Sequence, residues 1–244
     1  MAVLIASMLV GCKGGIREDP ILRLSAEEAL EQGRALMEKK KYTQAVNYLD
    51  HAFEVAPNSS TGRDALLLAA DSYYLHGGAA NYVKAEAKYR DFQNRFPTSD
   101  RSDFVQMQIA NCLFEQILKP DRDQAATYKA ETAFESLQQL YPTSEYAGEV
   151  DDRIAEIHDT LAEHEYRVGR YNYRRKIYVS AIWRFEGILE KYPDFDDLDK
   201  VLYLLGLSYR KVDRQEDAAA TFDRLRTECP DSKFVGKIPK VKKS

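Results

Sequence analysis

A spacing between alanine and proline recurs along the chain and constrains the fold more than any other feature. In each copy an alanine lies twelve residues before a proline, and a bulky residue lies four residues after the alanine. The five pairs are Ala45–Pro57, Ala85–Pro97, Ala130–Pro142, Ala181–Pro193 and Ala218–Pro230. The bulky residues are Leu49, Tyr89, Phe134, Phe185 and Phe222. A spacing kept this strictly indicates a repeated structural unit.

Three copies add a glycine twelve residues before the alanine, at Gly33, Gly169 and Gly206. This arrangement resembles the tetratricopeptide repeat, a helix–turn–helix unit of roughly 34 residues. A small residue on the first helix is expected to face the small alanine on the second, so that the two helices approach closely. The bulky residue is then expected to fill the gap between neighbouring helix pairs.

Each copy ends with residues that stop a helix. Proline disfavours helical backbone at the residue before it, so the second helix of each unit is expected to end there. Two residues after the prolines stand Ser59, Ser99, Ser144, Phe195 and Ser232. We expect the serines to accept a hydrogen bond at the start of the next helix.

The spacing predicts an all-α protein whose main domain, residues 25–232, is an α-solenoid of about five tetratricopeptide helix-turn-helix repeats. The expected repeats span about 25–59, 61–99, 103–144, 147–195 and 198–232. Ser25 and Glu28 predict a capping box at the first helix. A long helix over about 147–172 is expected to open the fourth repeat. Residues 233–244 are basic and are expected to form a flexible tail.

The first residues resemble a bacterial lipoprotein signal. An apolar run from Ala2 to Val10 is followed by Gly11 and Cys12, and the stretch "LVGC" resembles a lipobox. This predicts a signal peptide over 1–11, lipid attachment at Cys12 and a lipidated tether over 12–24. Lys13 after the cysteine favours the outer membrane by resemblance to enterobacterial sorting. No lysine or arginine precedes the apolar run, and a chance apolar leader is the alternative.

Composition argues against two other classes of protein. The formal net charge is −4, so no field strong enough to attract nucleic acid is predicted. No window approaches the ~20 apolar residues of a transmembrane helix. Apart from Cys12 the chain has Cys112 and Cys229, far apart among apolar residues. We interpret both as buried thiols, and a disulfide bond between them stays open in an oxidising compartment.

The sequence holds no group of residues that favours catalysis or a cofactor. It has no glycine-rich phosphate loop and no nucleophile elbow. His158 and His164 are six residues apart, whereas two metal ligands on one helix face are four apart. The paired carboxylates at 151–152 and 196–197 suit a helix start or a solvated surface. We therefore predict no catalytic residue, no cofactor and no metal site, and a protein that is not an enzyme.

Two aromatic stretches are candidates for binding. Tyr73 and Tyr74 are adjacent and cannot both face the same side of a helix, so one of them is a candidate for peptide contact on the concave surface. Residues 166–176, "YRVGRYNYRRK", mix aromatic rings with arginines and a lysine. This stretch is either the basic end of a helix, where cations are favourable, or a docking patch for an acidic partner. Both interpretations stay open.

The segment "LAEHEYRVGRYNYRRKIYVSAIWRFEGILEKYPD" at 161–194 resembles the BamD family, the lipoprotein subunits of the outer-membrane β-barrel assembly machinery. The segment "RDQAATYKAETAFESLQQLYPTSEYA" at 122–147 also matches this family. The resemblance covers nearly the whole chain after the leader and is most specific in the second half. Trp183, Asn172 and a shorter insertion in the third repeat depart from the family pattern.

The resemblance implies a non-enzymatic adaptor, lipid-anchored on the periplasmic face of the outer membrane. Its expected partners are a BamA-type barrel protein, bound through the last periplasmic POTRA domain, and other lipoproteins of the assembly complex. Unfolded outer-membrane proteins are its expected substrates. The family's interface arginine falls on Arg184, and we assign Tyr171, Tyr173 and Arg174 to the same docking surface. Tyr73 and Tyr74 are the candidates for contact with substrate peptide.

Repeats and a lipid anchor alone fit other proteins as well. A different lipidated scaffold of the envelope is the main alternative, either a pilotin-like protein for secretin or pilus assembly or a Tol-Pal-associated organiser. An enzyme or metalloprotein is a third class, which the missing catalytic and ligand patterns disfavour. The segment at 161–194 favours the assembly adaptor among these readings.

Overall fold

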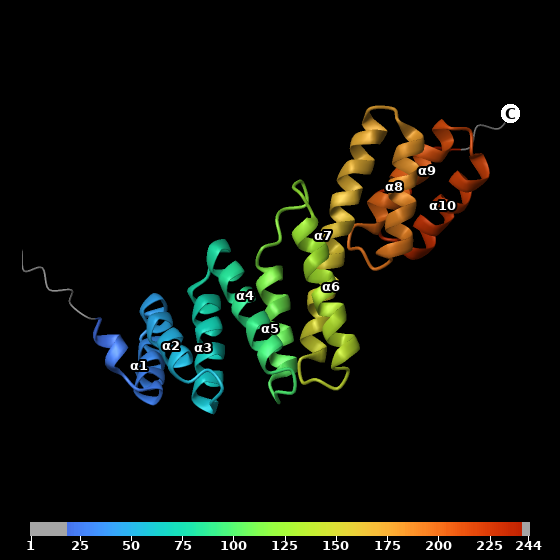
Figure 1. The fold of residues 1–244 in the computed structure, drawn as a ribbon. Helices are drawn as coiled ribbons and strands as arrows, with labels where there is room; N and C mark the ends of the chain where they lie inside the picture. Colours follow the sequence, from blue (N-terminus) through green and yellow to red (C-terminus); the bar gives the residue numbers. More distant parts are fainter. Residues whose placement is uncertain (1–18, 241–244) are drawn as a thin grey trace, which may run out of the picture. The chain divides into compact units, whose positions relative to one another are not determined.

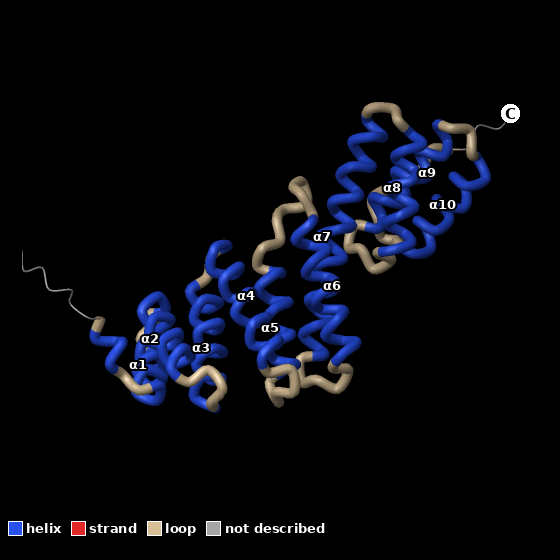
Figure 2. The backbone as a smooth tube through the Cα atoms, viewed as in Figure 1, coloured by secondary structure: helices blue, strands red, loops and turns tan. Residues whose placement is uncertain are grey.

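The computed structural model describes residues 19–240, and over these residues it consists of helices joined by turns, without strands (Figures 1 and 2). The helices of this part of the chain are η1 (Pro20–Arg23), α1 (Ala26–Glu38), α2 (Tyr42–Val55), α3 (Ser60–His76), α4 (Ala79–Arg95), α5 (Ser102–Phe114), α6 (Ala125–Leu140), α7 (Ala147–Arg174), α8 (Tyr178–Lys191), α9 (Leu198–Lys211), α10 (Gln215–Glu228) and η2 (Val235–Lys237). The all-α prediction is confirmed. The expected signal peptide and Cys12 lie outside the described residues.

Over the described residues the chain divides into two compact units, which meet between His76 and Gly77. Each expected repeat range holds two α-helices, but the division falls inside the second range, between α3 and α4. Gly77 and Gly78 stand at this point with φ of 75° and 88°, a left-handed conformation that glycine adopts without a steric penalty. The Gly-Gly pair therefore lets α3 end and α4 begin within two residues.

The first unit is a three-helix layer in which α1, α2 and α3 contact one another. Its core is built from small and branched residues: Ala29, Leu30, Ala45, Leu49, Ala52, Ala65 and Ala69. The predicted capping box is confirmed at the start of α1, because Glu28 N donates to Ser25 Oγ at 3.2 Å and Ser25 N donates to Glu28 Oε2 at 2.9 Å. Alanine-rich faces let these helices pack closely.

In the second unit each helix from α4 to α10 packs against the next along the chain, and α7 also contacts α9. Across both units the five alanines and five bulky residues of the repeated spacing are buried, as the pattern predicts. Four of the bulky side chains have no exposed surface: Leu49, Tyr89, Phe134 and Phe185. The pattern thus marks the packed face of every helix pair.

The expected role of the glycines needs a correction. An added Cβ at Gly33 would lie 2.6 Å from Leu49, at Gly169 2.6 Å from Phe185, and at Gly206 2.5 Å from Phe222. Each glycine therefore faces the bulky residue of its own repeat, one helical turn beyond the alanine. The bulky side chain fills the space that the glycine leaves inside the helix pair, instead of the gap between pairs.

The same three repeats share one turn. Residues with left-handed backbone stand seven positions after each glycine, at Lys40 (φ 57°), Lys176 (φ 63°) and Asp213 (φ 63°). A non-glycine residue in this conformation costs on the order of 1 kcal/mol, which helix packing on both sides offsets. The fixed turn explains why the glycine-to-alanine spacing is constant in these repeats. A Gly-Gly turn takes its place in the second repeat and a longer loop in the third.

The serines after the prolines accept backbone hydrogen bonds, as predicted, but they also clamp their own repeat. Ser144 Oγ accepts from Tyr146 N at 3.3 Å and donates to Asp103 Oδ2 at 2.9 Å. Ser232 Oγ accepts from Phe234 N at 3.1 Å and donates to Asp199 Oδ2 at 2.6 Å. In both repeats the end of the second helix is thereby tied to the start of the first.

The segments that flank the repeats contain short 3-10 helices where they are described, although a flexible tail is expected over 233–244. Residues 233–240 include η2, the ring of Phe234 stacks on Tyr203 at 4.8 Å, and Arg210 Nη1 donates to Pro239 O at 3.2 Å. These contacts place the segment after α10 against α9, where Phe234 covers the ring of Tyr203. Residues 19–24 of the expected tether contain η1, and His51 Nε2 lies 3.1 Å from Leu24 O.

Candidate functional site

The α7–α8 hairpin carries the residues that the sequence singles out for docking. The 28 residues of α7 form a continuous helix, and α8 returns antiparallel along its second half. Gly169 against Phe185 sets the close approach of the two helices. This packing determines which side chains of α8 stay at the surface.

Arg184 lies beside α7 and is held there by an ion pair. Its Nη1 donates to both carboxylate oxygens of Glu165, at 3.0 Å and 2.7 Å. Its guanidinium carbon also lies 4.8 Å from the ring centre of Trp183, which is 66% exposed. The side chain of Arg184 is itself 32% exposed. The arginine is thus oriented by one carboxylate and one ring, with Nε and Nη2 as donors for a further acceptor.

A polar cluster adjoins this ion pair and joins α6, α7 and the end of α8. The ring centres of His158 and Tyr192 lie 5.4 Å apart, and His158 Nε2 lies 3.0 Å from Glu131 Oε1. Tyr128 adjoins Tyr192 and Glu165. Burial raises the pKa of Tyr128, and the carboxylates of Glu165 and Glu131 add to the shift. Burial also raises the pKa of Glu131, while His158 opposes that shift. The cluster therefore connects Glu165, and through it Arg184, to His158 and Tyr192.

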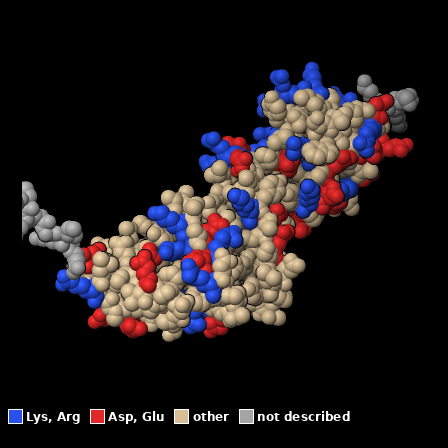
Figure 3. Space-filling model, viewed as in Figure 1, with Lys and Arg blue, Asp and Glu red and all other residues tan. Residues whose placement is uncertain are grey.

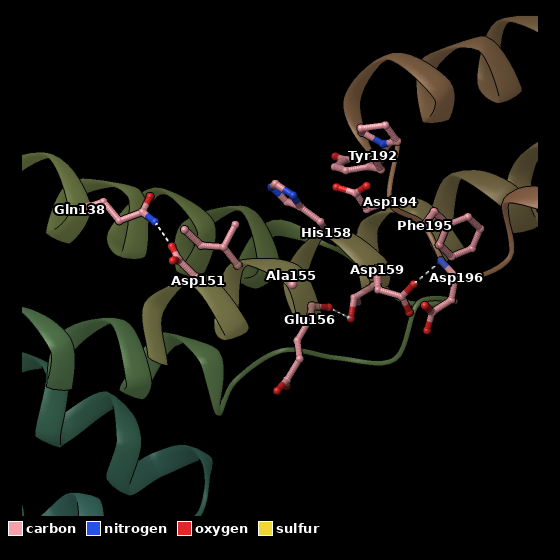
Figure 4. Close-up of a pocket in the computed structure, with 13 residues that line it drawn as sticks. Gln138, Asp151, Ala155, Glu156, His158, Asp159, Tyr192, Asp194, Phe195 and Asp196 are labelled. Atoms are coloured by element: carbon pink, nitrogen blue, oxygen red, sulfur yellow. Dashed lines mark hydrogen bonds between the residues drawn. The ribbon is translucent and has the colours of Figure 1, made fainter. Parts of the chain in front are cut away.

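His158 and Tyr192 also line an open pocket of about 650 Å³ between α7, the end of α6 and the α8–α9 connection (Figure 4). Its walls carry five carboxylates and no lysine or arginine: Asp151, Glu156, Asp159, Asp194 and Asp196. Gln138 Nε2 donates to Asp151 Oδ1 at 2.6 Å, and Asp196 N donates to Asp159 Oδ1 at 3.4 Å. Burial raises the pKa of Asp159, and the nearby carboxylates of Asp196 and Asp197 add to it. The pocket favours positively charged groups.

The other predicted docking residues have different neighbours from Arg184. Tyr171 and Arg174 line an open cleft at the end of α7, together with Arg167, Arg170 and Arg175. Tyr173 is half-buried and packs edge-on against Tyr178, with ring centres 5.6 Å apart. The four predicted residues therefore do not form one contact group. Arg184 belongs to the ion pair with Glu165, whereas Tyr171 and Arg174 belong to the hairpin end.

Tyr73 and Tyr74 lie near the end of α3, in the first unit. Both side chains are partly exposed, and both take part in contacts. Nothing in their surroundings separates one as the peptide-binding ring, so their role stays a prediction.

The histidines and cysteines have structural surroundings. His164 Nδ1 lies 2.7 Å from Pro120 O, and no group of three or more potential metal ligands occurs among residues 19–240. Cys112 is buried as predicted, whereas Cys229 is only partly buried, which corrects that prediction. The two are not joined in a disulfide bond. Burial and the carboxylate of Asp199 raise the pKa of the Cys229 thiol.

Sequence reasoning missed Glu165, Tyr128 and Tyr192 as neighbours of the docking arginine. Glu165 lies on α7, the antiparallel neighbour of α8, one helical turn before Gly169, so the hairpin indicates its helix but not its pairing with Arg184. Tyr128 comes from α6, so no local spacing indicates it. A search of the described helices finds none with the length and apolar character to span a membrane.

Comparison with known proteins gives a family and several relatives. The model of the family YfiO, described as outer membrane lipoprotein, matches residues 23–225. The outer membrane protein assembly factor BamD of Caulobacter vibrioides is 26% identical over 219 residues, covering 89% of this chain and 71% of that protein. The proteins of the same name from Neisseria gonorrhoeae and Haemophilus influenzae are 27% and 25% identical, covering 86% and 85% of this chain and 82% and 81% of theirs. A solved structure of MamA protein has a TM-score of 0.38 at 14% identity, covering 90% of this chain and 98% of that one.

Proposed function

The chain belongs to the outer membrane lipoprotein family YfiO, and from this membership we propose that it is a non-enzymatic adaptor in outer membrane protein assembly. The observation that carries the proposal is the family match over residues 23–225, which spans both helices of the hairpin with Arg184. The relatives named as assembly factors support the same role. They do not favour the pilotin-like or Tol-Pal-associated alternative.

The adaptor is held on the periplasmic face of the outer membrane by lipid on Cys12. The leader pattern and the description of the family support this anchor. We expect mass spectrometry of the mature protein to find a chain that begins at Cys12 and carries acyl groups. An unmodified thiol at residue 12, or a retained leader, would contradict the anchor without touching the docking proposal.

Arg184 and Trp183 form the contact with the periplasmic POTRA domain of a BamA-type barrel protein. An exposed tryptophan next to an oriented arginine is the composition typical of binding hot spots. The acceptor is a carboxylate of the partner, which takes the donors of Arg184 that Glu165 does not use. Other lipoproteins of the assembly complex bind elsewhere on the chain.

Unfolded outer-membrane proteins are the substrates, and they bind in the first unit near Tyr73 and Tyr74. An extended peptide binds to a helical repeat surface through side chains that enter spaces between helices. Ordering such a chain costs entropy, so its affinity stays modest, which suits transfer to the barrel protein. Crosslinking of an unfolded barrel precursor from positions 73 and 74 tests this contact, and capture only from the second unit would contradict it.

Photocrosslinking from position 183 tests the docking contact. Position 183 is chosen because an aromatic photoreactive residue there keeps a ring in the contact and leaves Arg184 in place. We expect a photoreactive residue at 183 to capture the periplasmic domain of the barrel protein in cells. The matched control is Leu140 at the end of α6, which is similarly exposed and belongs to the same unit.

Two outcomes would count against this docking contact. Capture of a secretin from position 183 would favour the alternative scaffold. Equal capture of the barrel protein from 140 and 183 would mean that the surface around Arg184 is not specific.

A further inference from the structure

The end of the α7–α8 hairpin, residues 167–179, concentrates positive charge (Figure 3). Arg174, Arg175 and Lys176 follow one another and are all exposed. None of these three has an ion pair within the part of the chain that the structure describes, whereas Arg167 is bonded to Glu163 at 2.5 Å. The hairpin end therefore presents three consecutive cations that no carboxylate of residues 19–240 neutralises.

Arginines at this end also form a cleft. Arg167, Arg170, Tyr171, Arg174 and Arg175 line an open space of about 420 Å³. The guanidinium group donates two parallel hydrogen bonds to a phosphate and is weakly hydrated, so clustered arginines favour phosphate over water. The cleft thus has the chemistry and size for phosphate groups at a surface.

Apolar side chains stand beside the cations. Val179 is 71% exposed, Tyr171 61% and Ile177 49%. Cations at a helix C-terminus stabilise the helix dipole, which accounts for Arg174 and Arg175 without any ligand. That account gives no reason for two aliphatic side chains and a tyrosine exposed around the same turn. Aliphatic, aromatic and basic side chains together are typical of segments that bind at a membrane interface.

We propose that the hairpin end binds the surface of an anionic lipid bilayer. The arginines bind lipid phosphates, and Ile177 and Val179 enter the boundary between headgroups and acyl chains. A projecting turn with exposed aliphatic side chains fits a bilayer better than an acidic protein surface, which would leave those side chains without an apolar partner. The contact is a second membrane attachment besides the lipid on Cys12. It uses residues other than Arg184 and so does not depend on the docking proposal.

Charge alone would not bring this chain to an anionic surface. The formal net charge is −4, so the average field opposes binding and only a local cluster overcomes it.

The turn between α1 and α2 offers an internal comparison. Lys39, Lys40 and Lys41 are also three consecutive exposed cations, and Lys40 has the same left-handed backbone as Lys176. No large exposed apolar residue occurs in that turn.

The test uses the full mature chain with Cys12→Ser, so that no acyl chain contributes. The amount of protein that sediments with vesicles of phosphatidylcholine plus phosphatidylglycerol is compared with the amount that sediments with vesicles of phosphatidylcholine alone. We expect binding only to the anionic vesicles. The triple substitution Arg174→Gln, Arg175→Gln, Lys176→Gln is expected to weaken it at least tenfold, because each cation near an anionic surface contributes substantially. Ile177→Ser with Val179→Ser, which keeps every charge, is expected to weaken it severalfold.

The matched control is Lys39→Gln, Lys40→Gln, Lys41→Gln, which removes the same charge from the same type of turn. We expect it to change binding less than twofold. Trp183, the chain's one tryptophan, lies one helical turn from Val179, and its emission is expected to shift to shorter wavelength on anionic vesicles. Circular dichroism confirms that each variant is folded.

Three results would overturn the proposal. The first is equal binding of the parent chain to neutral and anionic vesicles. The second is an equal loss of binding in the Lys39–Lys41 control, which would make the effect a matter of net charge. The third is an unchanged affinity after the Ile177 and Val179 substitutions, with unchanged Trp183 emission, which would leave an electrostatic patch suited to an acidic protein.

Discussion

Replacing Gly62 with alanine is expected to lower the free energy of unfolding of the α1–α3 unit by about 3 kcal/mol. A Cβ at this position would overlap the carbonyl oxygen of Ala56 and lie 2.9 Å from its carbon. That carbonyl cannot move easily, because Ser59 N and Ser59 Oγ both donate to it, at 3.1 Å and 2.8 Å. Amide hydrogen exchange in α1–α3 should become faster by about a hundredfold, since 1.4 kcal/mol is roughly tenfold in an equilibrium.

The position of Gly62 follows from an early helix start. α5, α7 and α9 begin five residues after their prolines, whereas α3 begins at Ser60, three residues after Pro57. The short connection brings the first turn of α3 against the end of α2, so only a residue without a side chain fits.

Gly148→Ala is the control for this prediction. Gly148 also lies in the first turn of a long helix, but no atom comes within 4 Å of an added Cβ. We expect this variant to be unchanged or up to about 1 kcal/mol more stable, as is usual for glycine to alanine in a helix. Equal stability of the two variants would show that the α2–α3 connection relaxes and would contradict the prediction.

Arg184→Glu is expected to weaken binding of the barrel protein's periplasmic domain at least tenfold. The substitution removes the donor proposed for the partner and places a second carboxylate beside Glu165. Buried or half-buried charge pairs at interfaces typically lose two or more kcal/mol when one partner is reversed. Calorimetric titration of the purified chain with the isolated domain measures the effect.

A charge exchange separates docking from folding in this experiment. Glu165→Arg with Arg184→Glu restores an ion pair between α7 and α8, so its thermal unfolding should return toward that of the parent chain. Its binding should stay weak, because the partner then faces a carboxylate at position 184. Parent-like affinity of the exchanged variant would mean that Arg184 acts only within the hairpin.

Much of the fold could be predicted from spacing, because packing in a helix pair depends on residue size at fixed intervals. The buried positions of Ala45, Ala181 and Phe185 follow from that rule. The partner of each glycine could not be read in the same way. Spacing along one chain does not reveal which of two neighbouring residues, the alanine or the bulky residue a turn later, reaches across to the opposite helix.

The segment after the repeats and the exposure of Cys229 were harder to predict. The basic composition around Lys233 predicts a flexible segment. The ring of Phe234, however, stacks on Tyr203 and holds this segment against α9. Cys229 lies at the end of α10, where its apolar sequence neighbours do not determine its exposure. For Phe234 the decisive contact comes from a distant part of the chain.

The candidate site follows from the resemblance to a family, and the chemistry of the neighbouring residues does not indicate it. Arg184 was identified because a related family places an arginine there, and nothing in its immediate sequence indicates Glu165, Tyr128 or Tyr192 as neighbours. These residues come from α6, α7 and the end of α8, and they meet only because the helices stack in order. A charged residue on the packed side of α7 is the one local signal of such a cluster.

The length of α7 has a mechanical consequence. Twenty-eight residues at about 1.5 Å each make a rod of roughly 42 Å, and no proline interrupts it. It contacts α6, α8 and α9 along its length. Because α7 is a stiff rod, a displacement of one part of it also moves the other. A cationic segment that entered the acidic pocket and displaced Ile154 would therefore move Glu165, and with it Arg184. Binding in the acidic pocket would thus change the orientation in which Arg184 meets a partner.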